Sequence, residues 1–206
     1  MDKRAEAIRS MFDRISPTYD LLNHVFSLNA NVRWRRRAAA EIPRAARVLD
    51  LCCGTGDFAF QAAVDGRRIF GLDFSAEMLR RARSKRRGRR VSLLQGDALR
   101  LPFRDGSFDA CTVGWGVRNF ADTRQGLAEI RRALRPGARL VILEFARPRT
   151  PLLKALYETY MKRVMRAVGD AVSRSRAYGY LSASVEGWHD AAGFVRLLGD
   201  CGFADP

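Results

Sequence analysis

The sequence predicts an α/β fold in which a parallel sheet carries helices on both faces. Three observations predict it: short apolar runs alternate with helical patterns from Ala46 onward, a glycine-rich turn follows the first run, and polar or small residues follow the other runs. Such alternation is typical of a parallel sheet with right-handed crossovers. Ligands of these Rossmann-like sheets bind beyond the carboxyl ends of the strands, where the strand order reverses.

A glycine turn joins the first predicted strand, over 47–52, to the first helix of the sheet. The run 48–51 is short and mainly apolar, as in a strand buried on both faces, and Gly54, Thr55 and Gly56 follow it. Glycines let a backbone approach a ligand where a side chain would collide. We expect Asp57 to be the N-cap of a helix over 57–64. Many turns of this kind contain two glycines for geometry alone, so the turn predicts a ligand only together with other residues.

The second predicted strand, over 68–73, ends in an acidic residue. Asp73 lies 17 positions after Gly56, close to the spacing of about 20 at which such folds place a carboxylate on ribose hydroxyls. The alternative is that Asp73 caps the next helix, over 75–86, with Ser75 and Glu77 sharing that work. We favour the ribose ligand.

The rest of the chain continues the pattern. We predict strands over 91–95, 108–114 and 138–145, helices over 123–134, 152–168 and 190–201, and a turn over 178–181. The carboxyl ends of parallel strands meet at one edge of a sheet, so the residues there predict one shared ligand site. These residues are Gly54, Asp73, Asp97, Gly114 and Glu144.

The first 45 residues precede the first strand. They predict helices over 4–14 and 32–42, with another helical passage starting at Asp20. A sheet of this type does not need them, so we predict a helical lid over 1–45 and a ligand-binding core over 46–206, within one domain. The alternative is that the leader merely packs across the sheet.

The chain of 206 residues has a net charge of +15, and most of its basic residues are arginine. Two arginine clusters, over 33–37 and 80–90, fit either a solvated surface or an anionic membrane surface; nucleic acid is the less favoured partner. No apolar run is long enough to span a membrane, and the first residues lack an apolar signal region. We expect a cytoplasmic protein, with peripheral binding to the inner face of the cell membrane as an open question.

The cysteines predict no metal site. Cys52, Cys53, Cys111 and Cys201 have no spacing typical of zinc ligands, and we expect all four to be small buried residues. The two histidines have no partner at ligand spacing, and we assign them no role.

Seven stretches stand out along the chain, in this order: MFDRISPTYDLLNHVFSLNANVRWRR, VLDLCCGTGDF, GLDFSAEML, GDALRLPF, DGSFDACTVGWGVRNF, LRPGARLVILEF and YLSASV. Taken together they resemble the class I S-adenosylmethionine-dependent methyltransferases and, more narrowly, the ubiquinone/menaquinone biosynthesis C-methyltransferase family. The resemblance covers about residues 8–203 and implies transfer of a methyl group from S-adenosylmethionine to a ring carbon of a polyprenylated quinol, either demethylmenaquinol or its benzoquinol counterpart.

The resemblance also implies a cofactor site. The glycine turn would contact the amino acid part of S-adenosylmethionine, Asp73 the ribose, Phe74 and Asp97 the adenine, and the backbone N–H of Ala98 the adenine ring. Carboxylates only accept hydrogen bonds, and adenosine offers donors at those places. The cofactor-binding residues predicted in this way are Gly54, Thr55, Gly56, Asp73, Phe74, Asp97, Ala98 and Gly114.

The chemistry of carbon methylation predicts the catalytic residues. Carbon is a weak nucleophile, so the neighbouring quinol oxygen should be deprotonated, and a cation near it stabilises the phenolate. Arg118, after the fourth strand, is placed for this, although it could instead pair with a structural carboxylate such as Asp122. Asp20 or Tyr19 on the lid is the candidate base. We assign Asn119 and Asn23 to substrate binding.

The chain departs from the family pattern at two places. Cys52 stands where the general methyltransferase loop has its first glycine, and only four residues follow Gly202, where the family normally adds two strands. Either the chain is truncated or its sheet is short. Without those two strands we expect the strand over 138–145 to be an open edge, the chain to be less stable, and self-association through that strand.

Three other functions stay open at this point. The charge favours an RNA or protein methyltransferase, but the chain lacks an NPPY-like tetrapeptide after the fourth strand. A nicotinamide dehydrogenase would carry GxGxxG in place of GTGD. A catalytically silent partner protein with this fold is the third alternative.

Overall fold

The sheet of this protein is parallel throughout, as predicted. The computed structural model describes residues 3–44, 46–146, 150, 152, 156–157, 159–173, 175 and 177–205. Five strands pair in the order β3-β2-β1-β4-β5, so the order reverses between β1 and β4. The strands are β1 (Arg47–Leu51), β2 (Arg68–Asp73), β3 (Val91–Gln95), β4 (Phe108–Gly114) and β5 (Leu134–Leu143).

Helices cover both faces of the sheet because alternate strand residues point to opposite sides. Leu49 and Leu51 of β1 pack in one core cluster with Leu127 and Ile130, whereas Val48 lies in a second cluster. Helices α6 (Thr123–Ala133) and α10 (Ala191–Asp200) contribute to the first cluster, and α3 (Ala30–Ala40) and α4 (Asp57–Ala62) contribute to the second. Helix α5 (Ala76–Lys85) contacts β2 and β3.

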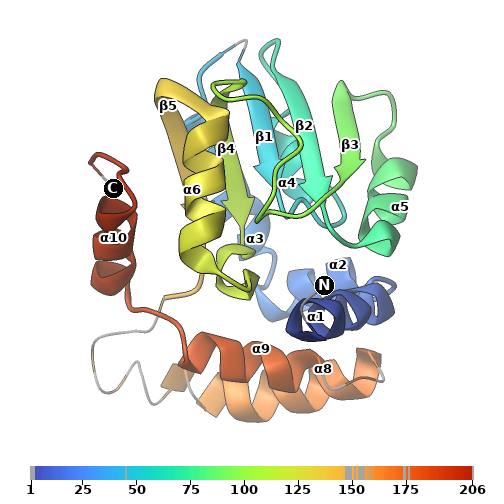
Figure 1. Ribbon diagram of the computed structural model, residues 1–206. Helices are drawn as coiled ribbons and strands as arrows, with labels where there is room; N and C mark the ends of the chain where they lie inside the picture. Colours follow the sequence, from blue (N-terminus) through green and yellow to red (C-terminus); the bar gives the residue numbers. More distant parts are fainter. Residues whose placement is uncertain are drawn as a thin grey trace.

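A further layer of helices lies across the carboxyl ends of the strands (Figure 1). A third core cluster joins its helices and includes Ile15, Leu22, Met165 and Tyr178. The predicted leader helices are present: α1 (Lys3–Ile15) and α2 (Tyr19–Phe26) pack over the edge where ligands of such sheets bind, whereas α3 packs on a face of the sheet. Their role as a lid stays a prediction. The layer also contains η2 (Tyr160–Met165), α8 (Arg166–Ser173) and α9 (Ala177–Glu186).

The turn predicted over 178–181 is wrong, because these residues lie inside α9. Gly179 suggested a turn, but tertiary packing decides the local structure: Tyr178 is buried and packs its ring edge-on against Phe26. The helix predicted over 152–168 falls partly outside the described residues, and its described part passes through the π-helical turn η2 into α8. The last predicted helix is confirmed as α10, with Asp190 as its N-cap.

The fifth strand begins earlier than predicted. Pro136 and Gly137 suggested a break before the strand, yet β5 starts at Leu134 and its register to β4 shifts between the Phe108 and Ala110 pairs. Gly137 has a φ of +75°, which allows the irregularity, and an edge strand tolerates proline because half of its N–H groups face away from the sheet. β5 is the edge of the described sheet; self-association through it stays a prediction.

No helix in the described ranges is both long enough and apolar enough to cross a lipid bilayer.

Candidate active site

Two cavities meet at the carboxyl ends of the strands. The first, which we call the strand-end cavity, is lined by residues that follow β1, β2, β3 and β4. The second, which we call the helical cavity, lies among α1, α2, α3, η2 and α9. Phe12, Tyr19 and Trp115 line both, so the cavities are neighbours. Six of the predicted cofactor residues line the strand-end cavity: Gly54, Asp73, Phe74, Asp97, Ala98 and Gly114.

The glycine turn after β1 has a left-handed backbone at alternate positions. Cys52, Gly54 and Gly56 have φ angles of +55°, +54° and +85°. Cys52 therefore holds a conformation that glycine adopts without cost, in agreement with its place at the first glycine of the methyltransferase loop. Cys52 is only half-buried and lines the strand-end cavity, so the expectation that all four cysteines are buried is wrong for it; Cys201 is half-buried too.

Asp57 is not the N-cap of the following helix. Gly56 holds the cap position, and the Asp57 carboxylate forms ion pairs with Arg35 and Lys85. A carboxylate in the first helical turn still benefits from the free N–H groups there, but its side chain serves the contact with the lid.

Asp73 joins the glycine turn to the end of β2. One of its carboxylate oxygens accepts a hydrogen bond from the Gly54 N–H at 2.8 Å, and the other accepts one from the Ser75 N–H at 2.9 Å. Ser75, not Asp73, caps α5 by accepting from the Met78 N–H. Burial raises the pKa of Asp73 above its ordinary value, while the backbone hydrogen bonds act against this shift. Each oxygen keeps a second lone pair for a ligand in the cavity.

The strand-end cavity offers hydrogen-bond acceptors of the kind that the adenosine part of the expected cofactor needs. Asp73 and Asp97 both line it, and one Asp97 oxygen already accepts from the Leu99 N–H at 2.9 Å; their contacts with ribose and adenine stay a prediction. Gly114 and Gly116 form a close-packed wall, since a Cβ on Gly116 would lie 2.6 Å from the Cβ of Cys52. Apolar side chains supply the flat surface that an adenine ring needs; they include Phe74, Leu99 and Phe120.

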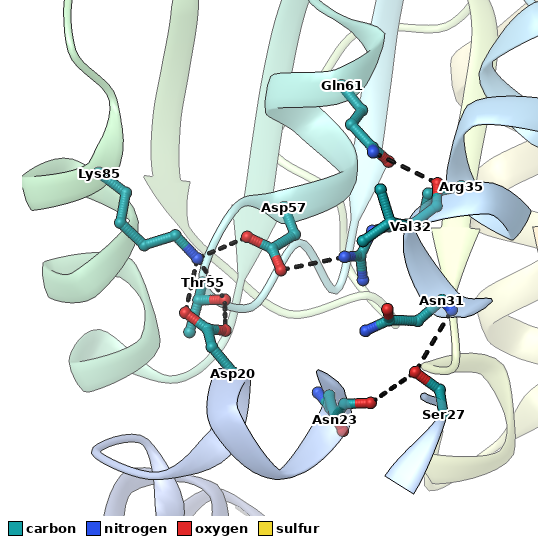
Figure 2. A network of polar contacts seen from close by, with 10 residues as sticks. All are labelled: Asp20, Asn23, Ser27, Asn31, Val32, Arg35, Thr55, Asp57, Gln61 and Lys85. Carbon is teal, nitrogen blue, oxygen red and sulfur yellow. Dashed lines mark hydrogen bonds and ion pairs between the residues drawn. The ribbon is translucent and has the colours of Figure 1, made fainter. Parts of the chain in front are cut away.

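A network of charged groups ties the N-terminal helices to the glycine turn (Figure 2). The Lys85 ammonium lies 2.6 Å from the Asp20 carboxylate and 2.5 Å from the Asp57 carboxylate. It also donates to the Thr55 hydroxyl, which in turn donates to Asp20. Arg35 of α3 completes the network through Asp57 at 3.2 Å. Two carboxylates thus face two cations across the boundary between lid and core.

This network gives Asp20 and Thr55 contacts that the sequence did not predict. Neither residue lines either cavity. Thr55 belongs to the turn that follows β1, and Asp20 belongs to α2, so their hydrogen bond connects the predicted cofactor turn directly to the lid. Asp20 is therefore placed to hold Tyr19, the next residue along the chain, at the junction of the two cavities.

Tyr19 and Asn23 lie on one face of α2, and both line the helical cavity. Burial raises the pKa of the Tyr19 hydroxyl, and a hydrogen bond with the Asn23 side chain opposes this shift. A raised pKa favours the neutral phenol, which donates a hydrogen bond. Asn119 lines the strand-end cavity instead, and its amide oxygen accepts from the Tyr180 hydroxyl at 3.2 Å.

Arg118 enters the helical cavity from η1 (Val117–Asn119), the short helix after β4. Its Nη1 donates to a Glu144 oxygen at 2.7 Å and to the Trp115 carbonyl at 2.6 Å, and the guanidinium lies over the Phe145 ring. The sequence left open that Arg118 pairs with a structural carboxylate such as Asp122; the structure shows such a pair, but with Glu144, whereas Asp122 caps α6. No described residue accepts a hydrogen bond from Nη2.

Sequence reasoning missed Lys85, Arg35 and the pairing of Glu144. Lys85 is one of only four lysines in an arginine-rich chain. This rarity could have marked it as a residue with a specific contact. The sequence predicted that Glu144 lies at a strand end but did not predict that it pairs with Arg118. Pairing across β4 and β5 depends on the register of the two strands, which the sequence does not reveal.

The fold, with a ligand-sized cavity at the strand ends, is that of the Rossmann-like S-adenosylmethionine-dependent methyltransferases. A solved S-adenosylmethionine-dependent methyltransferase from Thermotoga maritima has a TM-score of 0.68 to this structure at 21% identity, with 95% of this chain and 81% of that chain covered, which supports the fold. The sequence model of the ubiE/COQ5 methyltransferase family matches residues 1–205. The chain belongs to this family.

Curated relatives agree with this assignment. A demethylmenaquinone methyltransferase of Deinococcus radiodurans is 44% identical over 97% of this chain and 86% of its own length. A ubiquinone/menaquinone biosynthesis C-methyltransferase of Geobacter sp. (strain M21) is 41% identical over the whole of this chain and 91% of its own length.

Proposed function

We propose that this methyltransferase adds a methyl group to a ring carbon of a lipid quinol, demethylmenaquinol or the equivalent benzoquinol. The observation that carries this proposal is the Arg118 guanidinium in an apolar cavity that adjoins the strand-end cavity. Relatives of this chain are named for demethylmenaquinone methylation, which supports the naphthoquinol. A quinol ring is a flat apolar body with two polar oxygens, and the helical cavity offers aromatic walls together with a few polar groups.

The chain's own residues position the quinol for attack. S-adenosylmethionine, when bound, supplies an electrophilic methyl group on a sulfonium. Tyr19 and Trp115 border both cavities, so they hold the quinol ring against the end of the cofactor site. Alignment of this kind contributes on the order of several kcal/mol to a displacement between two bound groups.

Arg118 stabilises the charge that makes the ring carbon nucleophilic. Its Nη2 donates to the quinol oxygen, and the cationic neighbour lowers the pKa of that hydroxyl, so the hydroxyl loses its proton to water and the phenolate forms more readily. The ring carbon releases its own proton to water after it gains the methyl group. Glu144 and the Trp115 carbonyl hold Nη1 and thereby set the direction of the guanidinium. The Phe145 ring packs against one face of the guanidinium and keeps water from that face.

Tyr19 is the lid residue that we assign to contact with the quinol. Its neutral hydroxyl, kept neutral by burial, donates to a quinol oxygen while Asn23 orients it. Asp20, the other candidate base, acts through the network with Thr55 and Lys85 and holds α2 in place. Asn119 joins the two cavities through its hydrogen bond with Tyr180.

A methylation assay with a short-chain, water-soluble demethylmenaquinol tests the proposal. We expect a product that gains the mass of one methylene group, and we expect Arg118→Ala to reduce turnover by about a hundredfold or more while the dissociation constant of S-adenosylmethionine changes little. Cofactor binding without any quinol product would overturn the proposed reaction. Equal losses in cofactor affinity and turnover would overturn the role of Arg118.

The place of the chain in the cell follows from this substrate. A polyprenylated quinol resides in a membrane, so we propose that the chain works in the cytoplasm at the inner face of the cell membrane. The basic surface supports attraction to anionic lipid.

A further inference from the structure

Asn31 has a buried side-chain amide that the rest of the described chain leaves unpaired. It lies in the first turn of α3, is 3% exposed, and lines the helical cavity. Neither its amide nitrogen nor its amide oxygen has a hydrogen-bond partner among the described residues. Burial of an unpaired amide destabilises a folded protein, so such a group in a cavity wall indicates that a ligand pairs with it.

A second unpaired donor lies one helical turn further along α3. Arg35 is 6% exposed and lines the same cavity, and residues four apart share one face of a helix. Its Nη2 lies 3.2 Å from an Asp57 oxygen, which fixes the guanidinium, while no described residue accepts a hydrogen bond from its Nε. Figure 2 shows that the Asn31 and Arg35 side chains both extend from α3 toward the side on which Asp57 lies. One face of α3 thus supplies the cavity with N–H donors and one amide oxygen.

Hydrogen bonds with the end of α2 fix the position of Asn31. Its backbone N–H donates to the Ser27 hydroxyl at 3.3 Å, and that hydroxyl donates to the Asn23 carbonyl at 2.7 Å (Figure 2). Ser27 and Asn23 line the same cavity. The amide of Asn31 is therefore held in place by the helix that also carries Tyr19, and it needs no rearrangement to meet a ligand.

Two aromatic rings lie between this polar group and Arg118. The Arg35 guanidinium carbon lies 5.9 Å from the centre of the Trp115 ring, and the Arg118 guanidinium carbon lies 5.1 Å from the centre of the Phe145 ring. The centres of the two rings are 6.4 Å apart. All four residues line the helical cavity, which therefore has polar groups at both ends of one apolar wall. A quinol matches this arrangement, because its two oxygens lie on opposite sides of a flat ring.

We infer that Asn31, with the Arg35 Nε one turn away, binds the quinol oxygen distal to Arg118 and selects the reduced form of the ring. The inference rests on the proposed quinol substrate. A quinol hydroxyl donates one hydrogen bond and accepts another, so it satisfies the Asn31 oxygen together with one of the N–H donors. The carbonyl of the oxidised quinone only accepts, so the Asn31 oxygen would stay buried and unpaired. Only the reduced ring can form the phenolate that attacks the methyl group, so rejection of the quinone keeps the cavity free for substrate.

Binding of the two oxidation states tests the inference. Anaerobic calorimetry compares a short-chain demethylmenaquinol with its oxidised quinone, with S-adenosylhomocysteine present so that no methyl transfer occurs. We expect the parent to bind the quinol about tenfold or more tightly than the quinone. Asn31→Leu keeps a side chain of similar shape and removes its polar atoms, so the affinity for the quinol should fall about tenfold, the affinity for the quinone should change less, and the preference should disappear.

A control variant and a stability measurement accompany the titrations. Gln61→Leu removes an amide that donates to the Val32 carbonyl of α3 but lines neither cavity, and it should keep the parent's preference for the quinol. Asn31→Leu should not lower the denaturation midpoint, because its amide has no partner among the described residues.

The outcomes separate this inference from the proposed function. A preference for the quinol that persists in Asn31→Leu, or equal losses for both ring forms together with a lower denaturation midpoint, would overturn the inference. A parent that methylates the quinol but binds both forms equally would overturn the inference and leave the proposed function standing. A parent that binds neither form and methylates no quinol would overturn both.

Discussion

Arg118 and Glu144 form an ion pair in the interior, with Nη1 2.7 Å from Oε1 and each side chain only 5% exposed. The pair joins η1 to the end of β5 and sets the guanidinium at the wall of the helical cavity. Taking two charges out of water is costly, and such a pair keeps its stability only while both partners are present.

Replacement of Glu144 should therefore unfold the protein more easily. We expect Glu144→Gln to lower the free energy of unfolding by roughly 3 kcal/mol, because a buried guanidinium loses its counter-charge. Chemical denaturation measures the change. Glu41→Gln is the matched control, since the Glu41–Arg139 pair is exposed and should contribute less than about 1 kcal/mol. Equal effects of the two changes would show that the buried pair has no special role in stability.

Lys85 should couple the lid to cofactor binding. Lys85→Met leaves Asp20 and Asp57 facing each other without their shared cation, so α2 should loosen and S-adenosylmethionine should bind roughly tenfold more weakly. Calorimetry and hydrogen exchange over residues 3–40 measure the two effects. Arg80→Met, on the exposed side of the same helix, should leave both unchanged. Unaltered hydrogen exchange in the Lys85→Met variant would show that the network does not hold the N-terminal helices on the core.

Asp73 should make cofactor affinity depend on pH. Burial raises its pKa, so the carboxylate takes up a proton at a higher pH than an ordinary aspartate does. As the pH falls through this raised value, an acceptor for the ribose hydroxyls is lost and the affinity for S-adenosylmethionine should decrease. Asp73→Asn should weaken binding by about 1–3 kcal/mol and flatten the pH profile. An unchanged profile in Asp73→Asn would show that another group titrates.

Asp50 should make stability depend on pH in the opposite sense from an exposed, paired carboxylate. It is 1% exposed on β1, and burial raises its pKa to about 7, although the Thr112 hydroxyl donates to it at 2.6 Å. The unfolded chain releases this proton near the ordinary aspartate pKa, whereas the folded protein keeps it up to about pH 7. Stability contributed by Asp50 is therefore complete at low pH and is lost as the pH rises to about 7.

Replacement of Asp50 checks this sign. Asp50→Asn resembles the protonated form, so it should match the parent near pH 4 and exceed it above pH 7 by on the order of 2–4 kcal/mol. Denaturation of both proteins across this range measures the difference. A parent that is more stable than the variant at pH 8 would show that neighbouring groups stabilise the charged Asp50 carboxylate in the folded protein.

Local patterns predicted most of the sheet and the residues at its strand ends, because each strand and the turn after it depend on residues close in sequence; that these residues bind the cofactor stays a prediction. The alternation from Ala46 onward and the glycine turn located the strand ends, and six predicted residues meet in one cavity. The failures concern contacts between distant segments. Gly179 lies inside a helix because Tyr178 packs against Phe26, and Arg118 pairs with Glu144 because of the register of β4 and β5.

The helical cavity could not be predicted from local patterns for the same reason. Its walls come from α1, α2, α3, η2 and α9, and no single stretch of sequence carries its signature. Tyr19 and Asn23 could be named in advance because they share one motif. Asp20, in the same motif, proved to face Lys85 and Thr55, since side chains on successive helical residues point about 100° apart.

The position of the transferred methyl group tests the central claim most directly. We would incubate the protein with S-adenosylmethionine carrying a labelled methyl group and a short-chain demethylmenaquinol, and locate the label in the product by nuclear magnetic resonance. We predict a methyl group on the ring carbon beside a quinol oxygen, with product formation lost in Arg118→Ala. A methyl group on oxygen, or a parent protein that binds the cofactor and forms no methylated quinol, would contradict the account.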